Sequence, residues 1–215
     1  FILGIKHKIA NKLVYSKVKE RVGGKLRFFV SGGAPLSKEI AEFFAAADIT
    51  ILEGYGLSET SPVLTFNSPG SIRYGSVGKP LYNVDIKIAD DGEILAKGPN
   101  IMTGYFNNEE ATKEAIDSDG WFRTGDIGHF DDDGFLFITD RKKNILVTSG
   151  GKNVAPAPIE NSLVNSPFIE QSVVIGDKRN FISALIVPSQ EAVLTELSSQ
   201  DKTVSEDEIM TDHPD

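Results

Sequence analysis

The sequence predicts a mixed α/β and α+β protein made of three successive parts. A strand–helix–strand pattern in the first sixty residues predicts the end of a doubly wound α/β subdomain. Short strand patterns separated by turn signals then predict an antiparallel, barrel-like β-subdomain. Helical and strand patterns start again after residue 140 and predict part of a small α+β domain. We therefore expect domains at residues 1–60, 61–139 and 144–215, with a hinge at 140–143 and an acidic C-terminal tail.

The α/β part rests on four local patterns. Apolar residues at near-helical spacing predict an amphipathic helix over residues 2–22. The segment Lys25–Ser31 reads as a buried strand, Ser37 as the cap of a helix over Lys38–Ala47, and Asp48–Glu53 as a second strand. Because ligands bind at the carboxyl ends of parallel strands in such folds, we expect a ligand near the glycine-rich turns that follow. These turns are Ser31–Ala34 and Gly54–Gly56.

The β-rich part and the last part are predicted from the periodicity of apolar residues and from the turn signals between the periodic segments. Turn signals separate the expected strands, and the Thr124-Gly125-Asp126 turn divides two of them. The expected strands are Ser76–Lys79, Asp85–Ala89, Glu93–Lys97, Trp121–Arg123, Ile127–Asp131, Gly134–Thr139, Ile169–Gly176 and Ile182–Pro188. The expected helices are Asn108–Ala115, Pro156–Val164 and one beyond Ser189.

Composition excludes several classes of site. The chain has no cysteine and only three scattered histidines, which excludes disulfide scaffolds and thiol nucleophiles and argues against a histidine-rich metal site. The net charge of −9 argues against nucleic acid as a partner. No apolar run approaches the roughly 20 residues of a membrane span, and no signal-peptide pattern opens the chain, so we expect a cytoplasmic protein. Eight Lys/Arg against one acid in residues 1–27 favour a solvated helix face, with peripheral contact to anionic lipid as the alternative.

Common nucleotide and hydrolase motifs are absent. The sequence contains neither a P-loop nor a dinucleotide-binding glycine fingerprint. The run Gly56–Thr60 misses the serine-hydrolase elbow at its fifth position. The run Asp131–Gly134 lacks the spacing of a calcium loop, and a hairpin turn is the favoured interpretation.

Four other segments carry chemistry, most of them with a structural alternative. In Gly54–Thr60, glycines allow close backbone approach, tyrosine offers a face for a base, and the serine and glutamate that follow suit phosphate and Mg²⁺; a plain strand end is the alternative. Asp126 suits the two hydroxyls of a ribose, or else caps a turn. Arg141 suits phosphate or ribose oxygens, whereas Lys142 and Lys143 suit a hinge or solvent. Ser149–Lys152 combines flexible backbone with a cation, or is a simple loop.

Taken together, these segments resemble the adenylate-forming superfamily, which includes acyl-CoA synthetases, luciferases and peptide-synthetase adenylation domains. The resemblance extends from about Leu13 to Pro188, and its wording is most similar to the long-chain fatty acid–CoA ligase branch. The segments that carry it are Ser31–Leu36, Gly54–Thr60, Gly92–Tyr105, Trp121–Asp126 and Asp140–Glu160.

The resemblance implies a role for each matching residue. Nucleotide contacts would come from Gly33, Ala34, Pro35, Gly54, Tyr55, Gly56 and Asp126. Ser58 would meet the α-phosphate, Glu59 would bind Mg²⁺, and Arg141 would bind ribose or phosphate. Lys143 would be the hinge, and Gly150, Gly151 and Lys152 would lie near the pantetheine channel. Ser58 stands where many relatives have threonine, which keeps the hydroxyl.

The implied reaction is fatty acid + ATP + CoA → acyl-CoA + AMP + PPi. The family's phosphate loop and its C-terminal catalytic lysine have no counterpart among these residues. We therefore expect a fragment, with those elements upstream of Phe1 and beyond Asp215, that is inactive alone. Two alternatives stay open: an enzyme that loads a carrier protein, or a non-catalytic interaction module. Acyl chain length and oligomeric state are not indicated.

Overall fold

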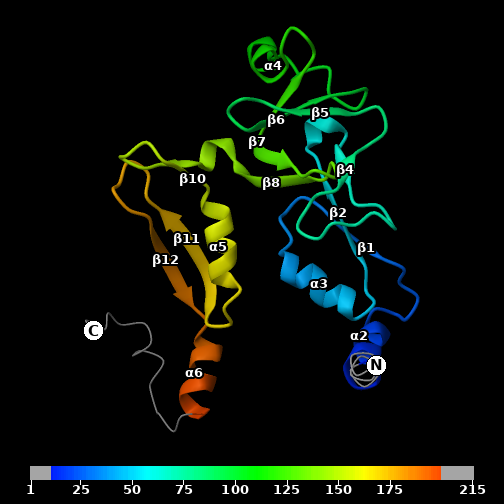
Figure 1. Ribbon diagram of the computed structural model, residues 1–215, viewed down its shortest axis with the longest axis vertical. Coiled ribbons are helices and arrows are strands. Elements are labelled where there is room, and N and C mark those ends of the chain that lie inside the picture. The colour runs from blue at the N-terminus through cyan, green and yellow to red at the C-terminus, as the bar shows by residue number, and fades with distance from the viewer. Residues whose placement is uncertain (1–10, 200–215) are drawn as a thin grey trace. The chain divides into compact units, whose positions relative to one another are not determined.

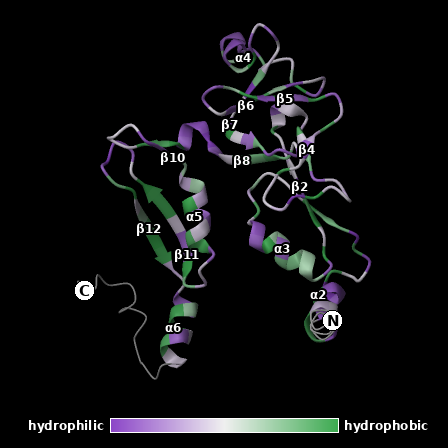
Figure 2. Ribbon diagram, in the orientation of Figure 1, coloured by the Kyte–Doolittle hydropathy of each residue, from purple (hydrophilic) through white to green (hydrophobic). Residues whose placement is uncertain are grey.

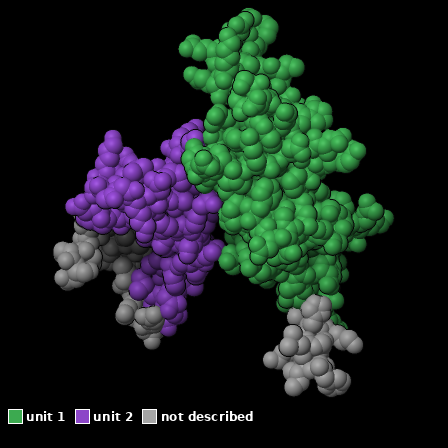
Figure 3. Space-filling view, turned by 45° about the horizontal axis from the view of Figure 1, so that its top comes forward, with its two compact units in different colours: residues 1–138 green, residues 139–215 purple. Residues whose placement is uncertain are grey.

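The computed structural model describes residues 11–199 of the chain. These residues belong to two compact units, residues 1–138 and 139–215, which are coloured separately in Figure 3. Each unit is described by itself below. The finer division into three subdomains and a hinge stays a prediction.

The first unit begins with the α/β part that the sequence predicts (Figure 1). Its elements are η1 (Asn11–Tyr15), α2 (Ser16–Arg21), β1 (Phe29–Ser31), α3 (Lys38–Ala46) and β2 (Ile51–Tyr55). Strands β1 and β2 are parallel, with Phe29 opposite Ile51, which confirms the strand–helix–strand order. The prediction of a buried strand over Lys25–Ser31 was wrong, because β1 covers only its last three residues and Phe29 and Val30 are exposed. The side chain of Ser37 accepts a hydrogen bond from the Ile40 amide at 3.2 Å and caps α3, as predicted. The first part of the helix predicted over residues 2–22 lies outside the described residues.

Strand β2 (Ile51–Tyr55) begins and ends later in the chain than the predicted strand Asp48–Glu53. The glycine-rich segment that begins at Gly54 was expected to be a turn, but Gly54 and Tyr55 are the last two residues of the strand. The reason is a pairing partner that sequence patterns did not reveal, β3 (Thr65–Phe66). Gly54 lies opposite Phe66 and Tyr55 opposite Thr65 in an antiparallel ladder, so the strand continues to residue 55.

Two four-stranded sheets make up most of the first unit. One has the order β1-β2-β3-β4, where β4 is Lys79–Pro80. The other has the order β5-β6-β7-β8, which confirms the antiparallel β-rich part where β5 meets β6 and β6 meets β7. Its strands and the nearby helices are β5 (Asp85–Ile88), β6 (Glu93–Lys97), β7 (Phe122–Phe130), β8 (Leu136–Arg141), η2 (Ser58–Thr60) and α4 (Glu109–Ala115).

A second correction concerns β7. The sequence predicted two strands separated by a turn at Thr124-Gly125-Asp126, whereas the structure has one strand through all three residues. The register explains the turn signal: Glu93 on β6 faces Ile127, but Leu95 faces Arg123. More residues on β7 than on β6 lie between these two pairs, so the strand bulges there. Gly125 has φ +72° at the bulge, a conformation that favours glycine.

The core of the first unit joins the two sheets. Its central cluster contains residues from β2, β6 and β8 together with the segments that connect strands. The members are Tyr55, Leu64, Val84, Ile94, Ala96 and Leu136. Burying a side chain such as Leu64 or Ile94 contributes about 1.5–3 kcal/mol, so this cluster fixes the sheets against each other. The site residues on β2 and β7 therefore stand on one packed body.

The second unit is a small α+β body. It contains η3 (Lys142–Asn144), β9 (Leu146–Val147), β10 (Asn153–Val154), α5 (Pro156–Val164), β11 (Ile169–Ile175), β12 (Ser183–Pro188) and α6 (Gln190–Ser199). Strands β11 and β12 correspond to the two predicted strands and pair antiparallel, with Val173 opposite Leu185. Helix α5 packs on β11, and Glu160 accepts a hydrogen bond from the Val174 amide at 2.7 Å. Figure 2 shows the hydrophobic colouring of this hairpin. The acidic tail lies largely outside the described residues.

Candidate functional site

The ends of β1 and β2 bring the two predicted nucleotide turns together. Ser31 lies opposite Glu53, and a Cβ on Gly32 would stand 3.5 Å from the carbonyl oxygen of Gly54. The following residues, Gly33, Ala34 and Pro35, are exposed at this edge. The predicted adenine-lining segment therefore lies beside Gly54 at the carboxyl ends of parallel strands, where α/β folds bind ligands.

The glycines at 54 and 56 have a packing role that the sequence did not indicate. A Cβ on Gly56 would stand 1.8 Å from the carbonyl oxygen of Pro62. A Cβ on Gly54 would stand 2.9 Å from the ring of Phe66. The chain's own backbone and side chains therefore require glycine at both positions, independently of any ligand.

Tyr55 and Asp126 are brought together although they are far apart in the sequence. The Tyr55 hydroxyl donates a hydrogen bond of 2.6 Å to Oδ2 of Asp126. Both side chains are buried, with 8% and 4% of their surface exposed. The Tyr55 ring belongs to the core cluster, so its hydroxyl is the part of the side chain that marks the site. Base stacking on this ring stays a prediction.

The bulge that carries Asp126 is held by Thr124. The Thr124 hydroxyl donates to the carbonyl oxygen of Ile94 at 2.8 Å and accepts from the Asp126 amide at 3.1 Å. Thr124 is buried, so both bonds are shielded from water. Sequence reasoning treated Thr124 only as part of a turn, and nothing in its spacing showed this bond to β6.

Ser58 and Glu59 lie in the short helix η2, directly after β2. Ser58 is exposed, and Glu59 is half-buried and accepts a hydrogen bond from the Tyr105 hydroxyl at 3.0 Å. Burial and the neighbouring Glu59 raise the pKa of Tyr105 above its usual value. The buried Thr60 hydroxyl bonds the Leu57 amide at 2.9 Å and holds η2 in place. Tyr105 had no role in the sequence prediction.

A buried acid, Glu53, lies in the middle of β2. Glu53 is buried, and this burial raises its pKa from 4.5 to about 7 because the charged carboxylate loses hydration. A hydrogen bond from the Gly75 backbone opposes part of the increase. Glu53 therefore changes charge near neutral pH beside the glycine-rich segment.

The remaining predicted residues lie in the second unit. Arg141 ends β8, and Lys143 lies in η3; both are exposed. Asp140, which the sequence prediction gave no role beyond the hinge at 140–143, is buried and accepts hydrogen bonds from the Arg141 amide at 2.7 Å and the Ala157 amide at 2.9 Å. Because Ala157 is in the first turn of α5, Asp140 caps that helix from outside it.

Gly150, Gly151 and Lys152 form the turn between β9 and β10. The Gly151 amide donates to the Thr148 carbonyl at 2.9 Å, and the Lys152 amide donates to the Thr148 hydroxyl at 3.1 Å. A Cβ on either glycine would meet nothing within 4 Å. Packing within the second unit therefore does not explain these two glycines, although the φ of +77° at Gly151 favours glycine there.

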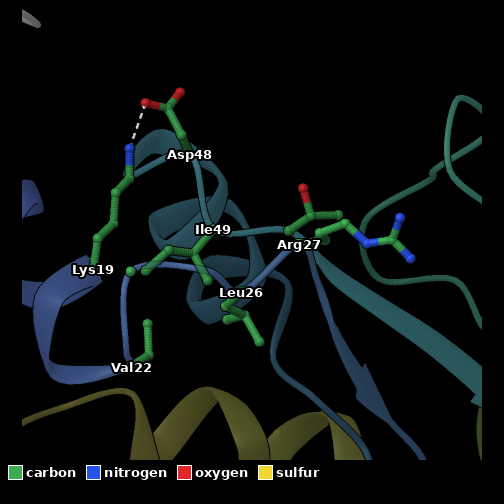
Figure 4. Close-up of a pocket in the computed structure, with 8 residues that line it drawn as sticks. Lys19, Val22, Leu26, Arg27, Asp48 and Ile49 are labelled. Carbon is green, nitrogen blue, oxygen red and sulfur yellow. Dashed lines mark hydrogen bonds and ion pairs between the residues drawn. The ribbon is translucent and has the colours of Figure 1, made fainter.

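Other features of the described residues do not form a ligand site. Figure 4 shows a pocket between α2 and the start of β2, where Lys19 forms an ion pair with Asp48 at 2.9 Å. Its volume of about 50 Å³ is far below the roughly 300 Å³ of a small-molecule site. Asp131 accepts hydrogen bonds from the amides of Asp133 and Phe135, as expected of the predicted turn. Within residues 11–199, no cluster of three potential metal ligands occurs, and no helix is long and apolar enough to cross a membrane.

Family models match both units of the chain. The model described as AMP-binding enzyme matches residues 5–106. The model described as AMP-binding enzyme C-terminal domain matches residues 143–210. The chain belongs to the AMP-binding enzyme family. This membership confirms the resemblance drawn from the sequence motifs.

Relatives of this AMP-binding enzyme chain include named CoA ligases. It is 50% identical over 191 residues to the long-chain-fatty-acid–CoA ligase FadD15 of Mycobacterium tuberculosis, covering 89% of this chain and 32% of that protein. It is 41% identical over 207 residues to the fatty acyl-CoA synthetase A of Dictyostelium discoideum, covering 89% and 31%. The chain thus spans about a third of the length of these curated relatives.

Solved structures share the fold of this family member. The o-succinylbenzoate CoA synthetase of Bacillus subtilis, in complex with ATP and magnesium, aligns with a TM-score of 0.68 and 33% identity over 83% of this chain and 38% of that one. ATP-bound MatB of Rhodopseudomonas palustris aligns with a TM-score of 0.69 and 33% identity over 82% and 39%. The predicted fold class is confirmed.

Proposed function

We propose that the protein containing this chain is a long-chain acyl-CoA synthetase. It would convert fatty acid, ATP and CoA into acyl-CoA, AMP and pyrophosphate. The observation that carries the proposal is the buried Tyr55–Asp126 hydrogen bond at the carboxyl end of β2, within a chain half identical to a named long-chain-fatty-acid–CoA ligase. The bond holds a buried carboxylate against Tyr55, which belongs to the segment proposed to bind the nucleotide.

The nucleotide role is assigned mainly to the first unit. An ionised carboxylate has about four acceptor sites, so Asp126 can accept ribose hydroxyls in addition to the Tyr55 hydroxyl. The exposed Gly33–Pro35 segment beside Gly54 would line the adenine, with Gly54, Tyr55 and Gly56 on the other side. Ser58, exposed on η2, would donate its hydroxyl to the α-phosphate.

Glu59 is the proposed protein ligand for Mg²⁺. Magnesium is usually held by one or two carboxylates together with substrate phosphates rather than by a cage of protein side chains. Glu59 fits this mode because it is a half-buried carboxylate one residue from Ser58, oriented by the Tyr105 hydroxyl. Bound Mg²⁺ would offset negative charge on the phosphates.

The second unit supplies the remaining groups. Arg141 offers a fork of donors to ribose or phosphate oxygens, and Lys143 is the proposed hinge between the two half-reactions. The open Gly150-Gly151 turn allows close approach of the pantetheine arm of CoA, with Lys152 as a neighbouring cation.

The chemistry proceeds in two balanced steps. The fatty acid carboxylate attacks the α-phosphorus of ATP and forms an acyl-adenylate, while pyrophosphate leaves. The CoA thiol then loses its proton to solvent and attacks the acyl carbon, which forms the thioester and releases AMP. The chain's residues act by positioning the reactants and by stabilising charge, which are the main sources of rate in phosphoryl transfer.

ATP–pyrophosphate exchange in the intact protein tests the assignment. Asp126→Ala is expected to raise the KM for ATP by about tenfold or more, because a charged hydrogen-bond partner of the ribose is lost. Asp132→Ala, which removes an exposed acid from the hairpin turn after β7, is the matched control. Unchanged ATP kinetics in Asp126→Ala would exclude the ribose role.

The hinge assignment has a separate test. Lys143→Pro restricts the backbone where rotation is proposed. We expect ATP–pyrophosphate exchange to persist while thioester formation falls. Equal loss of both half-reactions would contradict a hinge role.

A product assay distinguishes the alternatives. With CoA and a holo-carrier protein offered in parallel, thioester on CoA supports the proposal and thioester on the carrier supports a carrier-loading enzyme. The absence of either product in the intact protein supports the interaction module. Residues 1–215 alone are expected to give no turnover, since they contain neither the phosphate loop nor the catalytic lysine of the family.

Peripheral membrane contact through the basic residues 6–27 is part of the same proposal. Long-chain substrates partition into lipid, and a polybasic segment is attracted to anionic surfaces. Flotation with vesicles of phosphatidylserine and phosphatidylcholine tests it. Absence of the protein from the floating fraction would exclude the contact.

A further inference from the structure

Glu93 is a buried acid next to the bulge in β7. It lies at the start of β6 and is 3% exposed. Its Oε1 accepts a hydrogen bond from the Gly125 amide at 3.1 Å, and its Oε2 lies 3.5 Å from Nη1 of Arg123. The carboxylate therefore contacts β7 on the N-terminal side of Asp126 through both the backbone and a side chain.

The bulge explains why a hydrogen-bond acceptor is needed here. Where Glu93 faces Ile127 and Leu95 faces Arg123, the ladder leaves the residues between Arg123 and Ile127 without regular partners on β6. An amide that folding shields from water needs an acceptor in place of the water it loses. The Glu93 side chain supplies the acceptor for Gly125, and the next residue, Ile94, accepts from the Thr124 hydroxyl.

This arrangement determines the direction of Asp126. Gly125 has φ +72°, and the Asp126 amide is held by the Thr124 hydroxyl. The Asp126 carboxylate is then met by the Tyr55 hydroxyl at 2.6 Å. The peptide between residues 124 and 126 is thus fixed from β6 on one side and from β2 on the other.

We propose that Glu93 is a positioning residue that aims Asp126 at the nucleotide ribose by holding the Gly125 amide. The inference rests on the proposed ribose role of Asp126. Glu93 does not touch the nucleotide in this proposal. It acts through the backbone of β7. The Glu93 oxygen that accepts from the Gly125 amide carries this role, and the negative charge of Glu93 does not.

Two variants separate the oxygen from the charge. Glu93→Gln keeps a carbonyl oxygen for the Gly125 amide and removes the charge opposite Arg123. Glu93→Met keeps a similar volume and removes the acceptor. Ser76→Ala is the control for stability alone, because the buried Ser76 hydroxyl donates to the Arg73 carbonyl at 2.8 Å, outside the bulge.

The measurement is the ratio of dissociation constants for 2′,3′-dideoxy-AMP and AMP in the intact protein. Wild type is expected to prefer AMP by about tenfold, since each tenfold is about 1.4 kcal/mol, the size of a charged hydrogen bond. Glu93→Met should lose most of this preference, because it weakens the binding of AMP and leaves the binding of 2′,3′-dideoxy-AMP unchanged. Glu93→Gln and Ser76→Ala should keep it. If Glu93 had only a structural role, Glu93→Met would weaken the binding of both nucleotides equally and leave the ratio of dissociation constants unchanged.

The outcomes separate this inference from the proposed function. If wild type does not distinguish the two nucleotides, the ribose role of Asp126 fails and the inference falls with it. If wild type distinguishes them and Glu93→Met does so equally, the inference alone is overturned. If Glu93→Met does not fold, as judged by Trp121 fluorescence, Glu93→Gln decides, because it keeps the oxygen that accepts from the Gly125 amide and removes only the charge. Loss of the AMP preference in Glu93→Gln would overturn the inference.

Discussion

Tyr55 and Asp126 lie 71 residues apart in the chain and share a buried hydrogen bond of 2.6 Å. Tyr55 ends β2 of one sheet, and Asp126 lies in the bulge of β7 in the other sheet. The bond therefore links the two sheets of the first unit at the place where the family motifs meet. Its two partners were both singled out from the sequence, but for separate contacts with a nucleotide.

Removing the Tyr55 hydroxyl should show how much of the role of Asp126 depends on the orientation of its carboxylate and how much on its charge. Tyr55→Phe keeps the ring in the core and leaves the Asp126 carboxylate with one donor fewer. We expect the free energy of unfolding to fall by about 1 kcal/mol and the KM for ATP to rise by about three- to tenfold, less than for Asp126→Ala. Denaturation followed by Trp121 fluorescence and ATP–pyrophosphate exchange measure these changes. Tyr82→Phe is the control, since Tyr82 is 91% exposed; equal effects of the two variants would contradict the role of the bond.

Gly56 should tolerate no side chain. In Gly56→Ala the new Cβ would meet the Pro62 carbonyl at 1.8 Å, so the segment after β2 must move. Overpacking of this kind costs about 1–3 kcal/mol, which chemical denaturation followed by Trp121 fluorescence will detect. Gly150→Ala is the matched control: nothing lies within 4 Å of its added Cβ, and we expect a change within about 0.5 kcal/mol. A neutral Gly56→Ala would show that this packing is not required.

Glu53 should make stability depend on pH between about 4.5 and 7. Its pKa in the folded state is raised from 4.5 to about 7, so the folded state holds the proton more tightly than the unfolded state. The contribution to stability is fully present below pH 4.5 and is lost as pH rises through 7. Glu53→Gln, which mimics the neutral acid, should therefore gain roughly 1–3 kcal/mol over wild type between pH 4.5 and pH 8. Urea denaturation at several pH values tests this, and a constant difference between the two proteins would refute it.

Asp140 should stabilise helix α5 from outside the helix. Asp140→Ala leaves the Ala157 amide without its acceptor, and loss of a helix cap costs about 0.5–2 kcal/mol. Asp140→Asn keeps an acceptor oxygen and should cost less. Amide hydrogen exchange within residues 156–164 measures the effect locally, with the exposed Glu170→Ala as control. Unchanged protection of α5 in Asp140→Ala would exclude the capping role.

Local patterns predicted the elements whose residues carry their own signals. The Ser37 cap and the bounds of Pro156–Val164 were predicted correctly because capping and helical periodicity are set by neighbours in the chain. The parallel pairing of β1 with β2 followed from the strand–helix–strand pattern. The candidate site residues were found because their motifs are contiguous, although their roles in binding stay predictions.

Pairing between distant segments was not readable in the same way. The turn signal of Thr124-Gly125-Asp126 reflects a real departure from regular strand geometry, but whether a glycine-centred segment is a turn or a bulge depends on its partner, here Glu93 and Ile94 of β6. Likewise, Gly54 ends a strand because β3 returns to pair with it. Composition, periodicity and the residues of contiguous motifs can be read from the chain itself, and they were enough to predict the fold class and the family. The contacts of Asp126 with Tyr55, of Gly125 with Glu93 and of Asp140 with α5 arise because folding places distant buried groups together, where each polar group must find a partner.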